Sequence, residues 1–192
     1  MAETSQEPDL AHFKNIPWCA QLLSSPNIVI TPTNSREYKS STEDALFAET
    51  FKTDDTISAC LSFYSRPVPG IPRIEEIHTL LTLGYRLNGY PARAHGGVVA
   101  TLIDEVMGIL LSVNKKLGLA AMQADTVTAY LNVTYLKPVE TPGTVLVSAR
   151  FKEVKGRKHF LEATVKGESG EVLSKAEALW IGLETSKSKE KL

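Results

Sequence analysis

The chain has 192 residues, a formal net charge of −1 and 43% hydrophobic residues. This length suits one domain with some extra terminal sequence, and the hydrophobic fraction excludes a chain that is disordered throughout. The near-zero charge gives no electrostatic reason to expect nucleic acid or an anionic membrane surface as a partner. Two cysteines are too few for a disulfide framework or a Cys-rich zinc site, and the four histidines are scattered, so no metal is expected.

The first nine residues are acidic and polar, unlike a secretory signal or an Arg-rich transit peptide. No apolar run reaches the roughly 18 residues that a membrane span requires. The nearest run covers residues 98–113 and contains Asp104 and Glu105. We therefore expect a cytoplasmic protein without a membrane span, with a mitochondrial or peroxisomal location left open.

Residues 1–55 are predicted to form an N-terminal extension that is partly flexible. A flexible lead to about residue 15 precedes a short helix over 17–23, where Pro17 suits the first turn. An extended stretch at 28–30 and a short helix within 41–50 follow. This extension is expected either to cap a substrate pocket or to cover an edge of a sheet.

The region from residue 56 onward is dominated by strand patterns around one helix. Two β-rich segments cover 57–64 and 79–87. Gly96 and Gly97 then precede a helix predicted over 97–114, whose apolar residues surround almost its whole circumference, as in a buried helix.

Four further strands are predicted after this helix, with turns at 155–157 and 168–170 between the later ones. They cover residues 127–135, 145–151, 160–166 and 172–181. In the first of them, strict alternation predicts Thr128 and Tyr130 on the polar face, opposite Leu131.

This order of elements predicts an α+β domain over residues 56–184, with a charged C-terminal tail over 185–192. Consecutive strands joined by short loops form an antiparallel sheet, which here must wrap around the long helix to bury it. An uncovered sheet edge and an incompletely covered helix lead us to expect a homodimer.

Asp104 is the strongest candidate for chemistry, because it lies on an apolar helix with no basic residue within one helical turn. A dry carboxylate has a raised pKa, which suits a general base near neutral pH. The alternative is that Asp104 pairs with a cation from another strand.

The segment before the helix offers hydrogen-bond donors. The first N–H groups of a helix have no internal acceptor, so those of Gly96 and Gly97 are suited to stabilise an oxyanion. The two glycines are equally suited to a sharp corner in the chain. His95 is expected to bind a substrate or to fix the loop, Asn88 is a further donor or a turn residue, and Thr128 is an ordinary strand residue unless it faces the site.

The pattern His95-Gly96-Gly97 followed by Asp104 resembles the signature of hot-dog-fold acyl-CoA thioesterases. It is most similar to the phenylacetate-pathway type and the eukaryotic thioesterase-superfamily branch, within the 4-hydroxybenzoyl-CoA thioesterase superfamily. The stretch at 131–138 resembles the next strand of that family, and 154–158 resembles a following hairpin. The resemblance covers about residues 57–183.

The resemblance implies a role for each matching residue. Asp104 matches the catalytic general base or nucleophile, and Thr128 matches the residue that holds the attacking water. Gly96 matches the donor to the thioester carbonyl, with Gly97 as the second choice, and His95 matches the histidine that positions the substrate. Further substrate contacts are expected from Asn88, which is offset by about one residue from the family position, and from three basic residues on charge grounds: Lys155, Arg157 and Lys158.

The resemblance also implies an α+β hot-dog fold, a homodimer that pairs further into a homotetramer in many relatives, and an active site shared between subunits. The expected reaction is hydrolysis of an acyl-CoA, as in fatty acid metabolism, with CoA as part of the substrate and no cofactor. A carrier-protein thioester remains an alternative substrate. Met107, Leu111 and Tyr130 are candidates for the pocket wall or for the core.

The rival interpretation is a non-catalytic acyl-CoA-binding or protein-interaction module on the same fold. A hydratase is less consistent with the sequence, because the Asp-plus-His or His-plus-Glu pairing of those enzymes is not found at matching positions.

Overall fold

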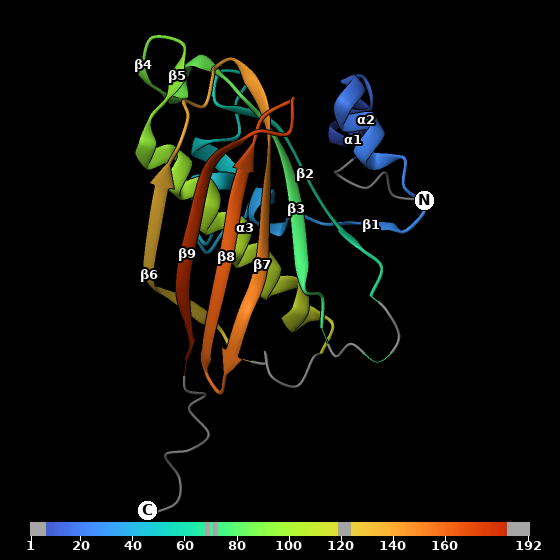
Figure 1. Cartoon of the computed structure of the whole chain (residues 1–192), viewed down its shortest axis with the longest axis vertical. Coiled ribbons are helices and arrows are strands. Elements are labelled where there is room, and N and C mark those ends of the chain that lie inside the picture. Colours follow the sequence, from blue (N-terminus) through green and yellow to red (C-terminus); the bar gives the residue numbers. More distant parts are fainter. Residues whose placement is uncertain (1–6, 68–69, 71–72, 119–123, 184–192) are drawn as a thin grey trace, which may run out of the picture.

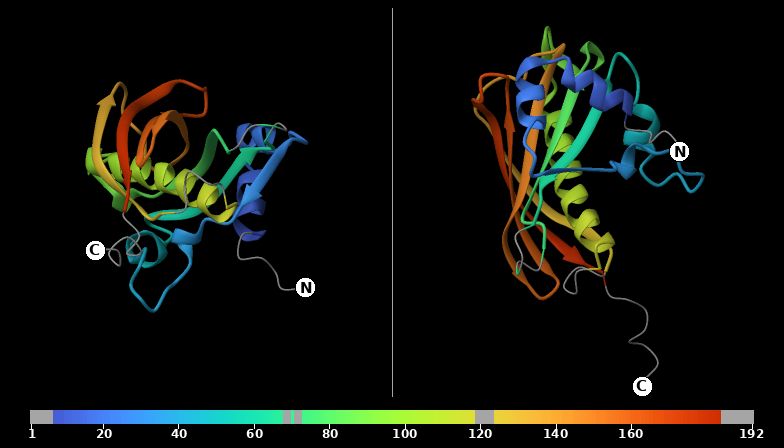
Figure 2. Two further views of the ribbon diagram at one scale, coloured as in Figure 1. Left: turned by 90° about the horizontal axis from the view of Figure 1, so that it is seen from below. Right: turned by 90° about the vertical axis from the view of Figure 1, so that its right-hand side faces the viewer.

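The computed structural model describes residues 7–67, 70, 73–118 and 124–183. Seven strands form one antiparallel sheet in the order β1-β2-β3-β7-β8-β9-β6. A long helix, α3 (Gly96–Lys116), lies along one face of the sheet, which curves around it (Figures 1 and 2). The seven strands are β1 (Ile28–Thr31), β2 (Ile57–Ser65), β3 (Glu76–Leu83), β6 (Thr126–Tyr135), β7 (Gly143–Lys155), β8 (Lys158–Lys166) and β9 (Val172–Gly182).

The shorter helices and strands lie in the N-terminal region and just before α3 in the chain. The N-terminal region contains α1 (Glu7–Lys14), α2 (Pro17–Leu23), η1 (Asn34–Arg36) and η2 (Leu46–Thr50). Near the start of α3, η3 (Tyr85–Leu87) is followed by a two-stranded ribbon of β4 (Asn88–Tyr90) and β5 (Arg93–Ala94).

The main core lies between α3 and the inner face of the sheet. Leu102, Ile103, Val106 and Leu110 of α3 are at most 1% exposed, as an all-round apolar helix predicts. By length and composition α3 is also long enough to cross a membrane, which corrects the expectation that no apolar run reaches this length. Half of its most apolar window is buried inside the fold, where it packs against β3, β6, β7 and β8.

A second core covers part of the outer face of the sheet. Alternation along the strands directs Leu61, Phe63 and Leu80 away from α3, and α1 and α2 pack over them. Phe13 of α1 is 0% exposed in this cluster. The expectation of a flexible lead up to residue 15 is therefore wrong for residues 7–14, which form α1 because Phe13 and Leu10 find an apolar surface there.

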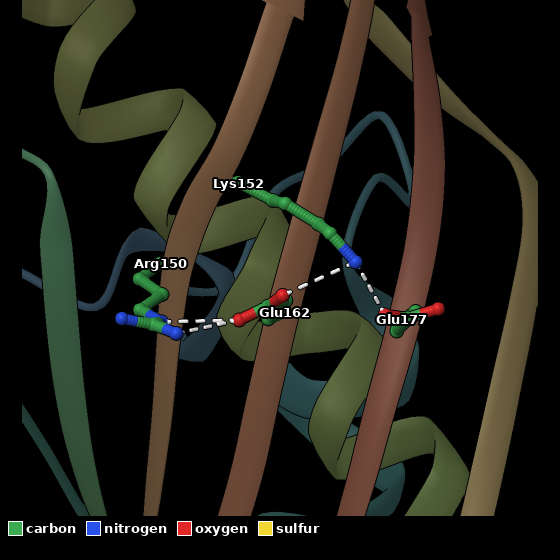
Figure 3. A network of polar contacts seen from close by, with 4 residues as sticks. All are labelled: Arg150, Lys152, Glu162 and Glu177. Atoms are coloured by element: carbon green, nitrogen blue, oxygen red, sulfur yellow. Dashed lines mark hydrogen bonds and ion pairs between the residues drawn. The ribbon is translucent and has the colours of Figure 1, made fainter.

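The other half of the outer face is polar. Four charged side chains of β7, β8 and β9 form a continuous ion-pair network in the order Arg150, Glu162, Lys152, Glu177 (Figure 3). Since each carboxylate has a cation beside it, this surface is suited to contact with water.

Most predicted elements are present, with two differences in the sheet and one in the N-terminal region. The stretch at 28–30 pairs with β2 as the end strand β1. The segment predicted over 79–87 ends as a strand at Leu83, because the chain turns there into η3; Gly84 at this turn lies too close to the backbone of Asp55 for any Cβ. The short helix expected within 41–50 is a single π turn, η2. The tail at 185–192 lies outside the described residues.

Candidate active site

Asp104 lies in the middle of α3 and faces the start of β6. Its Oδ1 accepts a hydrogen bond of 2.8 Å from the hydroxyl of Thr128. Within the described part of the chain, no ion pair reaches Asp104, so the alternative of a carboxylate paired with a cation from another strand does not hold there. Partial burial raises the pKa of Asp104, and the hydrogen bond from Thr128 opposes this rise.

The position of Thr128 corrects the face expected from strict alternation. A β-bulge separates Thr128, which pairs with Trp180, from Tyr130, which pairs with Leu179. The extra residue in the bulge puts Thr128 on the same face as Leu131, toward α3. It also leaves Tyr130 on the outer face, so the expectation that Tyr130 lines the pocket is wrong.

The start of α3 is organised around His95. The Nδ1 atom of His95 accepts a hydrogen bond of 2.9 Å from the N–H of Gly97 and so caps the helix. This supports the interpretation that His95 fixes the loop, and it leaves Gly96 as the better oxyanion donor because the first helical N–H has no internal acceptor. Gly89 packs on His95 so closely that a Cβ there would lie 2.8 Å from the imidazole Cδ2.

Two more residues support this loop. The phenol of Tyr135 donates a hydrogen bond of 2.8 Å to the carbonyl oxygen of Gly96. Asn88 accepts a hydrogen bond from the hydroxyl of Thr141, so its side chain is held beside the loop. Tyr135 was not singled out as a site residue from the sequence, although it belongs to the stretch at 131–138 that carries the resemblance.

The two parts of the site lie apart within one chain. Because an α-helix rises about 1.5 Å per residue, Gly96 and Asp104 are about 12 Å apart along α3. Reacting groups must approach to about 3–3.5 Å. Gly96 and Asp104 of the same chain are therefore too far apart to act on one small carbonyl group.

The basic residues of the predicted substrate-binding set lie on the β7–β8 hairpin, at the opposite end of the sheet from the start of α3 (Figure 1). Lys155 forms an ion pair of 2.9 Å with Glu153, and Arg157 donates to the carbonyl oxygen of Gly182 at 3.3 Å. Lys158 is exposed. The structure does not bring these residues to His95 of the same chain.

A cavity of about 560 Å³ adjoins Asp104. Its wall includes Leu111, as expected, whereas Met107 is fully buried in the core instead. Glu105 also lines the cavity, and burial raises the pKa of this carboxyl to about 7. Sequence reasoning missed Glu105 as a site residue, although a second acidic residue on a nearly all-apolar helix was a signal for it.

Other reactive groups do not contribute to this site. Cys19 and Cys60 are free and buried, and desolvation raises the pKa of each thiol to about 12, so neither forms a thiolate near neutral pH. In the described ranges, no cluster of His, Cys, Asp and Glu side chains is arranged to hold a metal ion.

Comparison with known proteins shows which class of protein the chain resembles. Residues 92–174, which span the start of α3 and Asp104, match the family model of the thioesterase superfamily. The acyl-coenzyme A thioesterase THEM4 of Mus musculus is 33% identical over 105 residues, which is 54% of this chain and 42% of that protein. The chain thus matches less than half the length of this curated relative.

Two other similarities extend the comparison. Verlamelin biosynthesis protein B from Lecanicillium sp is 25% identical over 206 residues, covering 91% of this chain and 88% of that protein. The solved structure of smu.793 from Streptococcus mutans UA159, bound to acetyl CoA, has a TM-score of 0.51 at 20% identity and covers 58% of this chain and 83% of its own. The solved structure confirms the fold, and the superfamily match together with THEM4 confirms the resemblance to hot-dog thioesterases.

Proposed function

We propose that this protein hydrolyses acyl-CoA thioesters to a carboxylic acid and free CoA. The observation that carries the proposal is the environment of Asp104. This carboxylate is partly buried, has a raised pKa, accepts a hydrogen bond from Thr128 and borders a cavity. A carboxylate without a cation partner is a stronger base than one in an ion pair, and a cavity beside it gives room for a substrate. The superfamily match and the acyl-CoA thioesterase name of a relative support the same reaction.

In the proposed reaction, Asp104 accepts a proton from a water molecule while the water oxygen attacks the thioester carbonyl carbon. Thr128 donates to Asp104, so its own oxygen lone pairs remain to hold that water. The tetrahedral intermediate then collapses, the C–S bond breaks, and the proton on Asp104 passes to the leaving thiolate. Direct attack by Asp104, which forms an anhydride that water then hydrolyses, is the alternative path.

The oxyanion donor in this proposal is the Gly96 N–H of a second copy of the chain, because the Gly96 of the same chain is too distant from Asp104. The position of β6 at the end of the described sheet supports a homodimer. One edge of β6 pairs with β9, and no described strand pairs with the other edge, which is therefore open to a second copy of the chain. Exposed apolar side chains lie along and just after β6: Val127, Tyr130, Tyr135 and Leu136. In such a dimer, Lys155, Arg157 and Lys158 are proposed contacts for the phosphates of CoA.

The test is release of free thiol from a panel of acyl-CoAs by wild type, Asp104→Asn and the exposed control Asp54→Asn. Asp104→Asn is expected to fold normally and to lose turnover by about 10³-fold, within the range of general-base catalysis, while Asp54→Asn keeps wild-type rates. Full activity of Asp104→Asn would contradict the proposal. Binding of acyl-CoA without turnover in wild type would favour the non-catalytic binding module instead.

Mixing two inactive variants tests the shared site. Gly96→Pro removes the N–H of the first helical residue, a position that tolerates proline. Co-refolded with Asp104→Asn, it is expected to restore roughly a quarter of wild-type activity, because about half of random dimers are mixed and each holds one intact site. No restoration in a dimer shown to be mixed would argue against a site built from two copies.

A further inference from the structure

The cavity beside Asp104 follows the second half of α3 as a groove. It is bordered by Asp104 and by eight later residues of the helix, the last of which is Lys116. Because an α-helix rises about 1.5 Å per residue, the groove extends about 18 Å along the axis from Asp104 to Lys116. Residues of the N-terminal extension and residues around the start of β6 form its sides, together with Trp180 of β9. The proposed catalytic carboxylate therefore lies at one end of an elongated site.

Three contacts between α3 and the region of β6 and β9 set the direction of this groove. They join Asp104 to Thr128, Gly108 to Trp180 and Lys115 to Asp125. The three helix residues lie on one face of α3, because they are spaced four and seven residues apart. A molecule that has its reactive group at Asp104 and follows the groove thus passes Gly108 first and reaches Lys115 last.

The charges along the groove decide which part of a thioester it suits. Five carboxyl groups and three lysines line it, and two of the lysines already pair with carboxylates, Lys39 with Asp44 and Lys115 with Asp125. An excess of acidic groups repels the phosphates of CoA. Apolar side chains contribute to the wall between the two ends: Ile109, Leu111, Val113 and Trp180. The groove is therefore better suited to the acyl group than to the CoA part of the substrate.

Gly108 leaves room within this wall. It lies four residues after Asp104, which is about 6 Å along the axis. A Cβ placed on Gly108 would lie 3.3 Å from Cη2 of the Trp180 ring, so a single added carbon already reaches contact distance. A longer side chain at position 108 would fill the groove beside Trp180. Glycine is unfavourable in the interior of a helix, so its presence in α3 is consistent with a need for open space at this point.

We propose that the groove holds the acyl chain, extended from Asp104 toward Lys116, and that Gly108 lets chains longer than about six carbons enter it. This inference rests on the proposed function and adds to it the residue that sets acyl chain length. An extended chain advances about 3.6 Å for every three bonds, so about five bonds separate the thioester carbonyl from Gly108. By the same measure, about fifteen bonds span the whole groove.

The experiment measures kcat/KM for butanoyl-, octanoyl- and hexadecanoyl-CoA at concentrations below those at which the esters form micelles. In wild type, kcat/KM is expected to rise at each step by at least about tenfold, because each added methylene is removed from water. Gly108→Leu is expected to abolish the gain from butanoyl to octanoyl, so that this ratio falls to about one or below. The exposed control Lys175→Leu, which adds the same side chain outside the groove, keeps the wild-type ratios.

A second variant tests the direction of the chain. Ser112 lines the groove about 12 Å beyond Asp104 along α3, which corresponds to about ten bonds of an extended chain. Ser112→Phe is therefore expected to keep the gain from butanoyl to octanoyl and to lose the gain from octanoyl to hexadecanoyl. Ratios are compared because a general loss of turnover lowers kcat/KM for all three esters alike.

The inference is overturned if wild type shows no gain with chain length, or if Gly108→Leu keeps the wild-type ratio of octanoyl to butanoyl. If Gly108→Leu does not fold, the exposed position 112 decides, and an unchanged ratio of hexadecanoyl to octanoyl in Ser112→Phe overturns the groove.

If no ester is hydrolysed, the proposed function fails, and calorimetric titration with the same intact esters decides the groove separately. In that case a dissociation constant that falls at least about tenfold from butanoyl- to octanoyl-CoA in wild type, but not in Gly108→Leu, supports the groove. Equal dissociation constants for the two esters in wild type overturn it.

Discussion

On the outer face of the sheet, Glu162 lies between Arg150 and Lys152, and the Arg150 guanidinium holds its pKa below the ordinary value (Figure 3). On the inner face, Asp104 and Glu105 border a cavity, and burial raises the pKa of both. The same type of side chain is thus stabilised as an anion on one face and held as a stronger base on the other. Buried carboxylates without a cation partner are typical of functional sites, which is why we propose that the chemistry takes place on the inner face.

The outer face of the sheet has one half covered by α1 and α2 and one half that carries the ion-pair network. A substitution in the covered half is expected to change stability the most. Phe13→Ala removes a fully buried ring between α1 and the sheet and should lower the free energy of unfolding by about 3–5 kcal/mol. Urea unfolding measures this loss. Leu22→Ala in α2, where the side chain is 37% exposed, is the control and should cost much less. A loss below about 1 kcal/mol for Phe13→Ala would mean that α1 contributes little to the fold.

Thr128→Val tests how the inner face keeps Asp104 ionised. Because the Thr128 hydrogen bond lowers the pKa of Asp104, its loss should raise that pKa and move the acid limb of the pH–rate profile to higher pH. The rate at neutral pH should fall by about 10–100-fold, the worth of a hydrogen bond to a charged group. The outward-facing Thr134→Val should leave the profile unchanged. An unshifted profile in Thr128→Val would remove Thr128 from the mechanism.

Glu105 should make stability depend on pH. Its pKa of about 7 in the folded state exceeds the ordinary 4.5, so the folded chain binds the proton more tightly than the unfolded chain. Stability therefore falls as pH rises from about 4.5 to about 7 and is flat above that range. Glu105→Leu should raise the free energy of unfolding by about 1–3 kcal/mol at pH 8 and change it little at pH 5. Equal effects at both pH values would contradict a buried, titrating carboxyl.

Glu162→Gln is expected to have the smallest effect, because Glu162 belongs to the surface network. Its lowered pKa adds stability above the ordinary 4.5, and this contribution is lost as pH falls through the folded value. The substitution should cost less than about 1 kcal/mol at neutral pH, and less again in 1 M salt, which screens exposed pairs. Denaturant unfolding at two salt concentrations measures both. A large, salt-independent cost would mean that the network is structural.

The sequence predicted the helices and strands whose hydrophobic periodicity lies within one continuous segment. The helix expected over 97–114 is α3, because apolar residues on every side of a helix indicate burial wherever the partner comes from. The strands after it were found for a similar reason, since alternation and turn residues lie within each hairpin. α1 was missed because few of its residues are apolar, and Phe13 is buried only through contact with β2 and β3.

The sequence by itself determined that this chain has a buried helix with a carboxylate at Asp104, preceded by His95 and two glycines. The tertiary structure decided which groups surround that carboxylate. The bulge in β6 brings Thr128 to Asp104. The fold also places Ser35 at the same cavity as Glu105, although Ser35 lies 70 residues earlier in the sequence. The physical reason is that periodicity shows which residues are buried, whereas bulges and distant segments decide what each buried polar group meets.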